Sequence, residues 1–278
     1  MYSIFIEIFF KSLKMEIPEI SVVIAAYNGE KYIKDQLNSI LGQIDDSTEI
    51  IISDNGSIDN TLEIINEFKD PRIKLYQNRE NKGSTFNFEY GLKKASGNII
   101  FLSDQDDIWL ENKFKTCIKW LEKFDVVVTD CKVVNADLRV LHESYFNFNK
   151  SGQGILKNLI KNSYLGCCMA FKRKVLQIAI PFPSDIAKSY IHDIWIGFVS
   201  ECFFSSHFIN TPLLLFRRHQ NSLSSAGNKS PFSFTQKFGF RWKIVKYFPL
   251  LLLRYLNLWF RRQSFTKTWK NLFSMMLS

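Results

Sequence analysis

The sequence contains no apolar stretch of the length that a membrane-spanning helix needs. The N-terminal run over residues 1–15 is apolar, but it has Glu7 in its middle and no basic residue before the apolar part. This pattern predicts neither a transmembrane helix nor a signal peptide. Because the regular pattern begins only after this run, Met15 is an alternative start, and we expect residues 1–17 to form an N-terminal extension.

Cysteine motifs for disulfides or structural metals are also missing. The five cysteines are an odd number, include no CxxC pair and accompany no histidine cluster at zinc spacing. They indicate reduced thiols in a cytosolic chain. No GxGxxG motif follows the first apolar run, which disfavours a dinucleotide-dependent oxidoreductase.

Acidic residues are absent from the last 48 positions. The chain of 278 residues has 36 Lys and Arg against 27 Asp and Glu, a net charge of +9. Residues 231–278 hold nine of the basic residues, so residues 1–230 have 27 charges of each sign and are neutral. With 46% hydrophobic residues, this length predicts one large globular domain, alone or with an appendage.

Between Glu19 and Asp130 apolar runs alternate regularly with helical patterns. The runs are apolar on both faces, which is typical of strands in a mainly parallel sheet covered by helices on both sides. We therefore predict an α/β fold. The expected strands cover residues 19–27, 48–53, 72–78, 98–103 and 125–130, and the expected helices cover 32–41, 59–68, 85–95 and 112–124.

The second half of the chain is less regular. Residues 164–176 suggest a strand leading into a helix, 191–202 a helix, and 207–219 one or two short strands. After Ser222 the composition changes to Ser, Gly and Asn, which indicates a boundary. We expect one domain over residues 18–225 and a separate tail over 226–278.

The tail has an unusual composition, with Phe, Tyr or Trp at thirteen of the last 48 positions. After Pro249, the residues Arg254, Asn257 and Arg261 fall on one helical face, with leucine and tryptophan around the rest. A basic, aromatic helix without acidic residues suits the surface of a membrane that contains anionic lipid. The alternative is a C-terminal helical pair that packs on the domain or in a dimer.

Polar residues follow the expected strands at the edge of the sheet where open α/β proteins bind ligands. The second strand ends in Asp54, and the fourth is followed by Asp104, Asp106 and Asp107. Clustered carboxylates repel one another unless a cation lies between them. Oxygen ligands favour Mg²⁺ or Mn²⁺, which also bind substrate phosphates. The alternative is that these residues form a turn or cap a helix, and for Asp107 we adopt that interpretation.

Taken together, these segments resemble family 2 of the glycosyltransferases, which has the GT-A fold. Residues 21–33 are similar to the family's opening strand and turn, 53–61 to its nucleotide-contacting loop, and 81–109 to its donor region through the DxD motif. Residues 164–176 resemble its acceptor-side segment, and 191–198 resemble the start of the helix that holds the general base.

Residues 216–224 look like the closing loop of bacterial rhamnosyltransferase-like members. Two features depart from the family pattern. Ala25 and Ala26 replace the usual Pro-Thr, so one hydroxyl contact to the nucleotide base is missing. Cys167 and Cys168 give a less common form of the acceptor segment.

The resemblance implies a donor site for a nucleotide-diphosphate sugar. Ala26 and Asp54 would meet the nucleotide base, and Asp104 would contact the ribose or the metal. Lys82 and Asn87 lie where the family contacts the donor.

The resemblance also implies the groups that perform the transfer. Asp193 would take the proton from the acceptor hydroxyl as it attacks the anomeric carbon, and a single base of this kind gives inversion at that carbon. Asp106 would ligate the Mn²⁺ or Mg²⁺ ion that bridges the diphosphate. His219 would be a further metal or diphosphate contact, beside Arg217 and Arg218.

Several of these residues also have a structural interpretation. Asp193 suits the positive end of a helix, and Asp54 suits an Asx turn. Lys82 and His219 suit a solvated surface.

Two tryptophans follow the acidic motifs, Trp109 and Trp195. Each would either stack on a sugar ring or pack in the core.

The sequence therefore predicts a metal-dependent, inverting glycosyltransferase that uses a UDP- or dTDP-sugar, with dTDP-rhamnose as one candidate donor. The expected acceptor is a saccharide or lipid-linked saccharide of bacterial surface polysaccharides, such as capsule or lipopolysaccharide. We expect a cytoplasmic protein that is peripherally associated with the inner membrane surface. The alternative is a catalytically inactive carbohydrate- or nucleotide-binding module of the same fold. Nucleic-acid binding by the tail is disfavoured, because Leu250–Leu253 suit lipid better.

Overall fold

The computed structural model describes residues 19–78, 81–188, 192–219 and 234–261. The expected N-terminal extension over residues 1–17 therefore lies outside the described residues, as do Met15 and the expected domain boundary after Ser222.

The first half of the chain forms four parallel strands, in the spatial order β3-β2-β1-β4. Their isoleucine and valine runs are almost fully buried in β1, β2 and β4, which confirms the prediction of strands covered on both faces. Helices connect them, and every element lies within a few residues of its expected range. The elements are β1 (Ile20–Ala26), α2 (Ile33–Leu41), β2 (Thr48–Asp54), α3 (Thr61–Glu67), β3 (Ile73–Gln77), α4 (Ser84–Lys94) and β4 (Ile99–Asp104).

The second half continues the same sheet with mixed strand directions. Strand β8 (Met169–Lys172) lies between β4 and β6 (Val126–Asn135) and is antiparallel to both. Strand β9 (Ser206–Arg218) runs parallel to β6 and is one strand of 13 residues, where we expected one or two short ones. Two short antiparallel strands complete the sheet, β5 (Ile108–Trp109) beside β9 and β7 (Val140–His142) beside β6.

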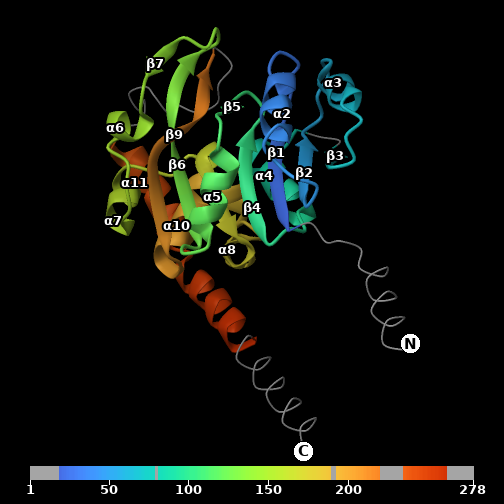
Figure 1. Cartoon of the computed structure of the whole chain (residues 1–278). Coiled ribbons are helices and arrows are strands. Elements are labelled where there is room, and N and C mark those ends of the chain that lie inside the picture. The colour runs from blue at the N-terminus through green and yellow to red at the C-terminus, as the bar shows by residue number, and fades with distance from the viewer. Residues whose placement is uncertain (1–18, 79–80, 189–191, 220–233, 262–278) are drawn as a thin grey trace, which may run out of the picture.

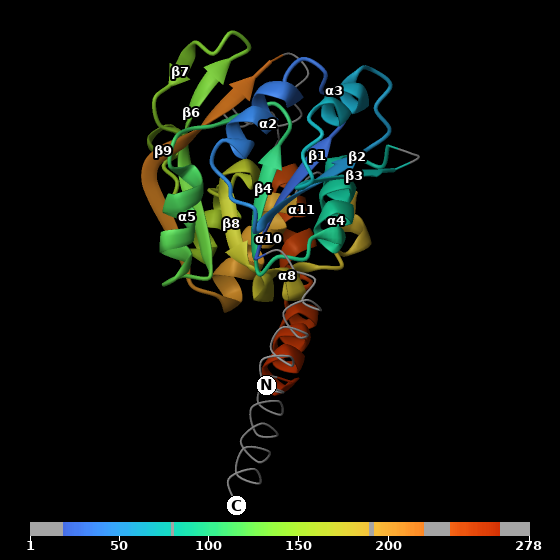
Figure 2. The same cartoon turned by 45° about the vertical axis from the view of Figure 1, so that its right-hand side comes forward.

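Helices cover both faces of the sheet. Helices α2 and α5 (Lys113–Leu121) lie on one face, and α4, α8 (Arg173–Ala179) and α10 (His192–Phe203) lie on the other (Figures 1 and 2). The carboxyl ends of β1, β2 and β4 meet at the upper end in Figure 1, so the polar residues that follow these strands gather there. The remaining elements are α6 (Tyr145–Asn149), α7 (Ile155–Ile160), the 3₁₀ turn η1 (Gly166–Cys168), α9 (Ser184–Ala187), α11 (Phe234–Val245) and a last helix over residues 248–261.

The described part of the tail packs on the domain along one side. Leu251 is fully buried, and Arg254 Nη1 donates to the carbonyl oxygen of Ile178 at 3.0 Å. The Tyr247 hydroxyl donates to Asp185 Oδ1 at 2.7 Å, and Lys246 Nζ lies 2.6 Å from Asp185 Oδ2. These residues therefore pack on the domain, which was the alternative to a membrane-surface helix in the sequence analysis.

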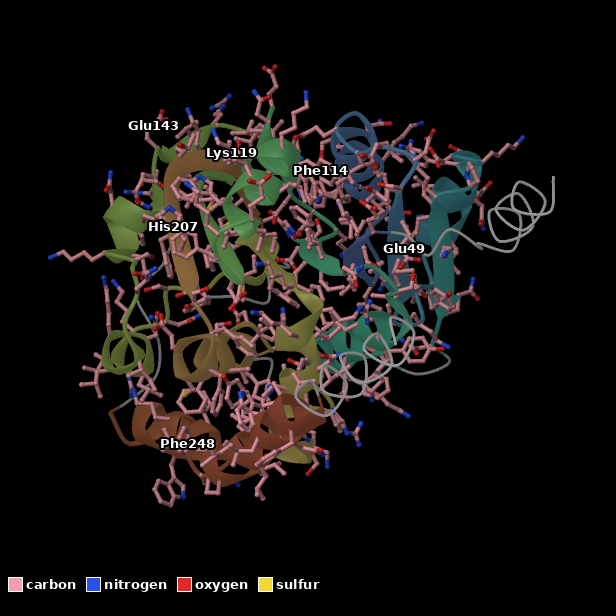
Figure 3. All side chains as sticks on the ribbon, turned by 60° about the horizontal axis from the view of Figure 1, so that its bottom comes forward. Glu49, Phe114, Lys119, Glu143, His207 and Phe248 are labelled. Atoms are coloured by element: carbon pink, nitrogen blue, oxygen red, sulfur yellow. The ribbon has the colours of Figure 1, made fainter. Side chains whose placement is uncertain are left out.

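The other side of the tail is exposed and apolar. Trp242, Leu253 and Phe260 are each more than 60% exposed. Figure 3 shows the end of the molecule from which the tail extends, with Phe248 on the last helix. The ring of Phe248 is partly exposed and stacks on the ring of Phe203 in α10, with the ring centres 5.9 Å apart. No helix among the described residues is long and apolar enough to cross a bilayer.

Candidate active site

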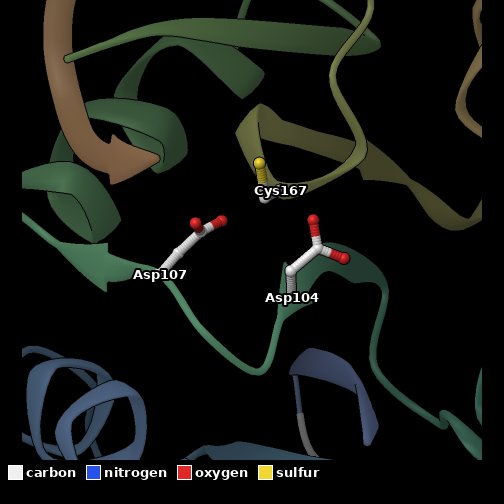
Figure 4. A group of neighbouring side chains, drawn as sticks. All are labelled: Asp104, Asp107 and Cys167. Carbon is white, nitrogen blue, oxygen red and sulfur yellow. The ribbon is translucent and has the colours of Figure 1, made fainter. Parts of the chain in front are cut away.

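The loop after β4 brings two carboxylates and a thiol together. Asp104 is the last residue of β4 and Asp107 lies in the loop that follows, and we call residues 104–107 the acidic loop; Cys167 lies in η1, directly before β8. One ligand atom of each lies within 4.8 Å of the other two, and Figure 4 shows the two carboxylate groups on either side of Cys167. The insertion of β8 beside β4 is what places Cys167 next to the acidic loop.

Asp107 differs from its prediction. We interpreted it as a turn or cap residue, but its side chain is fully buried and faces the site, so that interpretation is wrong. Its Oδ1 accepts a hydrogen bond from the backbone N–H of Arg217 at 2.9 Å. Its Oδ2 is buried and has no hydrogen-bond partner among the residues that the structure describes.

The acidic loop is electrostatically unfavourable by itself. Burial, reinforced by the charges of Asp106 and Asp193, raises the pKa of Asp104 to about 8. Burial and the charges of Asp106 and Asp104 also raise the pKa of Asp107 well above its ordinary value. A bound cation would favour the ionised carboxylates, so the chemistry of the donor set fits a divalent ion.

Asp106 and His219, the two expected metal ligands, contact each other. His219 Nε2 lies 2.7 Å from Asp106 Oδ2, although the two residues are 113 positions apart in the chain. Two ligand atoms about 2.1 Å from one octahedral ion lie roughly 3 Å apart, so this spacing fits a shared Mg²⁺ or Mn²⁺. The contact places His219 in the site, beside the ring of Tyr32 at 4.9 Å. Its role as a metal contact stays a prediction.

Arg217 holds the acidic loop against β9. Its side chain is 5% exposed, and its Nε donates to the carbonyl oxygen of Asp106 at 2.8 Å. Its Nη1 donates to the carbonyl oxygen of Ala136 at 3.0 Å, and its guanidinium carbon lies 4.5 Å from the ring centre of Tyr32. The sequence placed Arg217 beside His219 but gave no sign of this bracing function.

Asp193 lies in the first turn of α10, as expected. Its Oδ1 accepts a hydrogen bond from the N–H of Ile194 at 2.7 Å, and burial raises its pKa to about 7. A Cβ on Gly166 would lie 3.7 Å from the Cβ of Asp193. Gly166 directly precedes Cys167, so η1 lies between Asp193 and the acidic loop.

Asp54 and Ala26 lie at adjacent strand ends. Asp54 is buried, and its Oδ2 accepts from the N–H groups of Gly56 and Ser57 at 3.0 Å each, which is the Asx turn of the alternative interpretation. The Ala26 carbonyl accepts from Asn55 N and from Asn87 Nδ2 at 2.9 and 3.0 Å. These bonds fix the shape of the loop that the resemblance assigns to the nucleotide base.

Asn87 and Lys82 flank this loop. Asn87 is buried and bridges two strand ends, because its Oδ1 also accepts from the Ser53 hydroxyl. Lys82 is exposed, and its Nζ lies 5.4 Å from the ring centre of Phe86. In this arrangement Asn87 positions the strands, and its contact with a donor stays a prediction.

Three aromatic groups near the motifs are structural. Trp109 and Trp195 are 3% and 0% exposed, so core packing and not sugar stacking describes both. His192, which the sequence analysis passed over, stacks on Phe88 with ring centres 4.2 Å apart. Both nitrogens of His192 are buried without partners among the described residues, and burial lowers its pKa to about 3.

Comparison with known proteins decides the family. The sequence profile described as "Glycosyl transferase family 2" matches residues 21–178, more than half of the chain. The chain belongs to glycosyl transferase family 2. This glycosyltransferase is therefore an enzyme of the transferase class, as the motifs predicted.

Two relatives from Escherichia coli are named for a reaction. The chain is 29% identical over 213 residues to "UDP-Glc:alpha-D-GlcNAc-diphosphoundecaprenol beta-1,3-glucosyltransferase WfgD", covering 74% of this chain and 79% of WfgD. It is 39% identical over 103 residues to WfaP, which is named for the same reaction, covering 37% of this chain and 41% of WfaP.

Solved structures show that the glycosyltransferase has the expected GT-A fold. The Staphylococcus aureus TarS 1–349 structure in complex with UDP-GlcNAc matches with a TM-score of 0.64 at 22% identity, covering 80% of this chain and 65% of that chain. A mannosyltransferase from Pyrobaculum calidifontis in complex with GDP-Man and Mn²⁺ matches with a TM-score of 0.57 at 18% identity, covering 86% and 69%.

Proposed function

We propose that this glycosyltransferase moves a sugar from a UDP-sugar to a lipid-linked saccharide, with inversion at the anomeric carbon. The observation that carries the proposal is that the acidic loop and Asp193 both lie next to η1, the acidic loop beside Cys167 and Asp193 beside Gly166. It would place the groups that hold the donor and the group that activates the acceptor on either side of one reaction centre.

The donor end is built from Asp54, Ala26 and Asp104. We assign the base to the loop after β2, where Asp54 fixes a narrow turn, and the ribose to Asp104. The choice of UDP rests on the UDP-Glc in the names of WfgD and WfaP and on the UDP-GlcNAc complex of TarS. A dTDP-sugar, including dTDP-rhamnose, is the second candidate because of the resemblance at residues 216–224.

The acceptor end is Asp193. With a pKa near 7, its carboxylate is basic enough to take the hydroxyl proton and is still ionised at slightly alkaline pH. Asp106 and His219 would hold an Mg²⁺ or Mn²⁺ ion, which when bound offsets the charge that develops on the leaving diphosphate. Arg217 keeps Asp106 in place for that purpose.

The lipid-linked acceptor is taken from the diphosphoundecaprenol acceptors in the names of WfgD and WfaP. The exposed apolar side of the tail supports a peripheral position on the inner membrane surface, and the cytoplasmic location follows from that proposal. In Figure 1 the helix over residues 248–261 leaves the domain at the end opposite to the acidic loop. The tail would therefore tether the enzyme and would not line the site.

A thermal-shift panel tests the donor site. UDP, dTDP and GDP are each added with and without Mn²⁺, since a ligand of the native state raises the melting temperature. We expect a Mn²⁺-dependent shift with UDP that is lost in Asp106→Ala. A shift with dTDP alone would replace UDP as the donor nucleotide.

A transfer assay distinguishes the enzyme from the alternative, a catalytically inactive binding module. With UDP-Glc and a GlcNAc-diphospholipid acceptor, the proposal predicts sugar transfer that is lost in Asp193→Asn. Nucleotide binding without transfer to any acceptor of this class would favour the binding module.

A further inference from the structure

The cluster of Asp104, Asp107 and Cys167, here called the thiol–carboxylate cluster, is a different donor set from the Asp106–His219 pair. It offers two carboxylates and one thiol whose ligand atoms lie within 4.8 Å of one another (Figure 4). Thiolates favour borderline and soft cations such as Zn²⁺, whereas Mg²⁺ and Mn²⁺ prefer sites built from oxygen.

The buried carboxylate of Asp107 indicates that this cluster lacks a component. Its Oδ2 is buried without a hydrogen-bond partner among the described residues, and a buried polar atom in that state is costly. The buried ammonium of Lys113 does not fill this place, because its Nζ donates to the Thr129 hydroxyl and to the carbonyl oxygen of Cys167 at 3.3 and 3.1 Å.

The geometry admits a metal ion. A tetrahedral ion with sulfur at about 2.3 Å and oxygen at about 2.1 Å separates its ligand atoms by roughly 3.5 Å. The ligand atoms lie within 4.8 Å of one another, so metal binding would require them to close by about 1 Å. Three protein ligands leave the fourth position open to water or to a diphosphate oxygen.

We propose that the thiol–carboxylate cluster is a second cation site, selective for Zn²⁺ over Mg²⁺ and Mn²⁺. Binding converts the Cys167 thiol to a zinc thiolate and releases its proton to the solvent, with no change in oxidation state. The site shares Asp104 with the proposed donor site, so Zn²⁺ bound there inhibits transfer.

Metal binding is measured first, without nucleotide. Titration calorimetry of the full chain with Zn²⁺, in two buffers of different ionisation enthalpy, counts the released protons, and we expect at least one per ion. Co²⁺ as the probe should give a thiolate-to-metal charge-transfer absorption band. Cys167→Ser should abolish this band and weaken Zn²⁺ binding at least tenfold.

Matched variants separate this site from other thiols and from the Asp106–His219 pair. Cys202→Ser, a cysteine of α10, should retain the band, and Asp106→Ala should retain it while losing the Mn²⁺ response. If Cys167→Ser does not fold, Asp107→Asn replaces it, because its amide oxygen still accepts from Arg217 N–H. An unchanged band in the Cys167 or Asp107 variant overturns the proposal.

The inhibitory effect rests on the proposed function and is tested separately. Zn²⁺ should lower turnover in the wild type and should lower it at least tenfold less in Cys167→Ser, with reversal by a chelator. Equal inhibition of both proteins would overturn the effect on transfer. If the enzyme shows no turnover but the band depends on Cys167, the proposed function fails and the metal site stands.

Discussion

The side-chain amide of Gln105 pairs with the peptide of Tyr27: its Oε1 accepts from the Tyr27 N–H at 2.8 Å, and its Nε2 donates to the Tyr27 carbonyl at 2.9 Å. The middle residue of the DxD motif thus ties the acidic loop to the end of β1. Gly29 makes room for this pair, since a Cβ there would lie 2.3 Å from Gln105 Oε1.

This pairing predicts a selective defect in Gln105→Ala. Loss of two hydrogen bonds at the surface should lower the unfolding free energy by only about 1 kcal/mol. The loosened loop should raise the KM for the donor sugar several-fold while kcat changes less. Gln77→Ala, an exposed glutamine of β3, is the control, and equal KM values in the two variants would contradict the prediction.

Asp193 predicts a pH dependence of turnover. Burial raises its pKa from 3.8 to about 7, so below pH 7 the base is progressively protonated and kcat should fall about tenfold per pH unit. Asp193→Asn should lose turnover by at least about 10²-fold at all pH values. Asp137→Asn, an exposed turn residue, should keep the wild-type profile.

The raised pKa of Asp193 also makes stability depend on pH, and stability should change in the opposite direction to turnover as pH rises. The folded protein keeps a proton on Asp193 that the unfolded chain releases above about pH 4, so the unfolding free energy falls as pH rises toward 7. Above pH 7 this loss is complete. Asp193→Asn should therefore melt at a higher temperature than the wild type at pH 8, but not near pH 4. A lower melting temperature at pH 8 would show that the carboxylate stabilises the fold.

Arg217 predicts a coupling between stability and metal binding. Lysine cannot reproduce its bonds to the carbonyls of Asp106 and Ala136 or its stacking on Tyr32. Arg217→Lys should lower the unfolding free energy by about 2 kcal/mol in urea titrations and weaken the Mn²⁺-dependent UDP shift. Arg139→Lys at an exposed turn should change neither quantity.

Two glycines in helices predict opposite effects of the same substitution. A Cβ on Gly197 of α10 would lie 2.6 Å from ring carbons of Tyr164, which is buried and donates from its hydroxyl to Glu201 at 2.9 Å. Gly197→Ala should therefore destabilise the protein by about 1–3 kcal/mol despite its better helix propensity. Among the described residues, nothing lies within 4 Å of a Cβ on Gly239 of α11, so Gly239→Ala should stabilise by up to about 1 kcal/mol. Chemical denaturation of both variants checks the pair, and a shared sign would contradict it.

The first half of the fold follows from local sequence. The isoleucine and valine runs of β1, β2 and β4 have no polar face, so their burial between two helical layers is encoded within each run. The acids that follow β4 were also recognisable, because polar residues after an apolar strand gather at the carboxyl edge of a sheet.

The rest depends on contacts between distant segments. Strand β8 pairs with β4 across about 70 positions, and no local pattern states that it lies between β4 and β6. That placement brings Cys167 to the acidic loop, while Arg217 reaches Asp107 across 110 positions and buries it. A turn interpretation of Asp107 was reasonable from its neighbours and failed because its partners come from β9.

The tail predicts membrane binding that depends on a few exposed side chains. Trp242, Leu253 and Phe260 are 62%, 66% and 61% exposed, and the last 48 residues hold nine basic and no acidic residues. The full chain should sediment with vesicles that contain anionic lipid, less with neutral vesicles, and less as salt is raised. Replacing the three apolar residues by serine should weaken vesicle binding at least tenfold.

Ile58→Ser provides the control for this experiment. Ile58 is 89% exposed, but it lies in the loop after β2, at the carboxyl ends of the strands and away from the tail. If general surface hydrophobicity caused vesicle binding, Ile58→Ser would reduce it as much as a single tail substitution such as Leu253→Ser. If the tail is the membrane contact, Leu253→Ser alone should reduce binding and Ile58→Ser should not.

Because the tail leaves the domain opposite to the acidic loop, transfer to a water-soluble acceptor should be unchanged in Leu253→Ser, whereas transfer to a vesicle-bound acceptor should fall with binding.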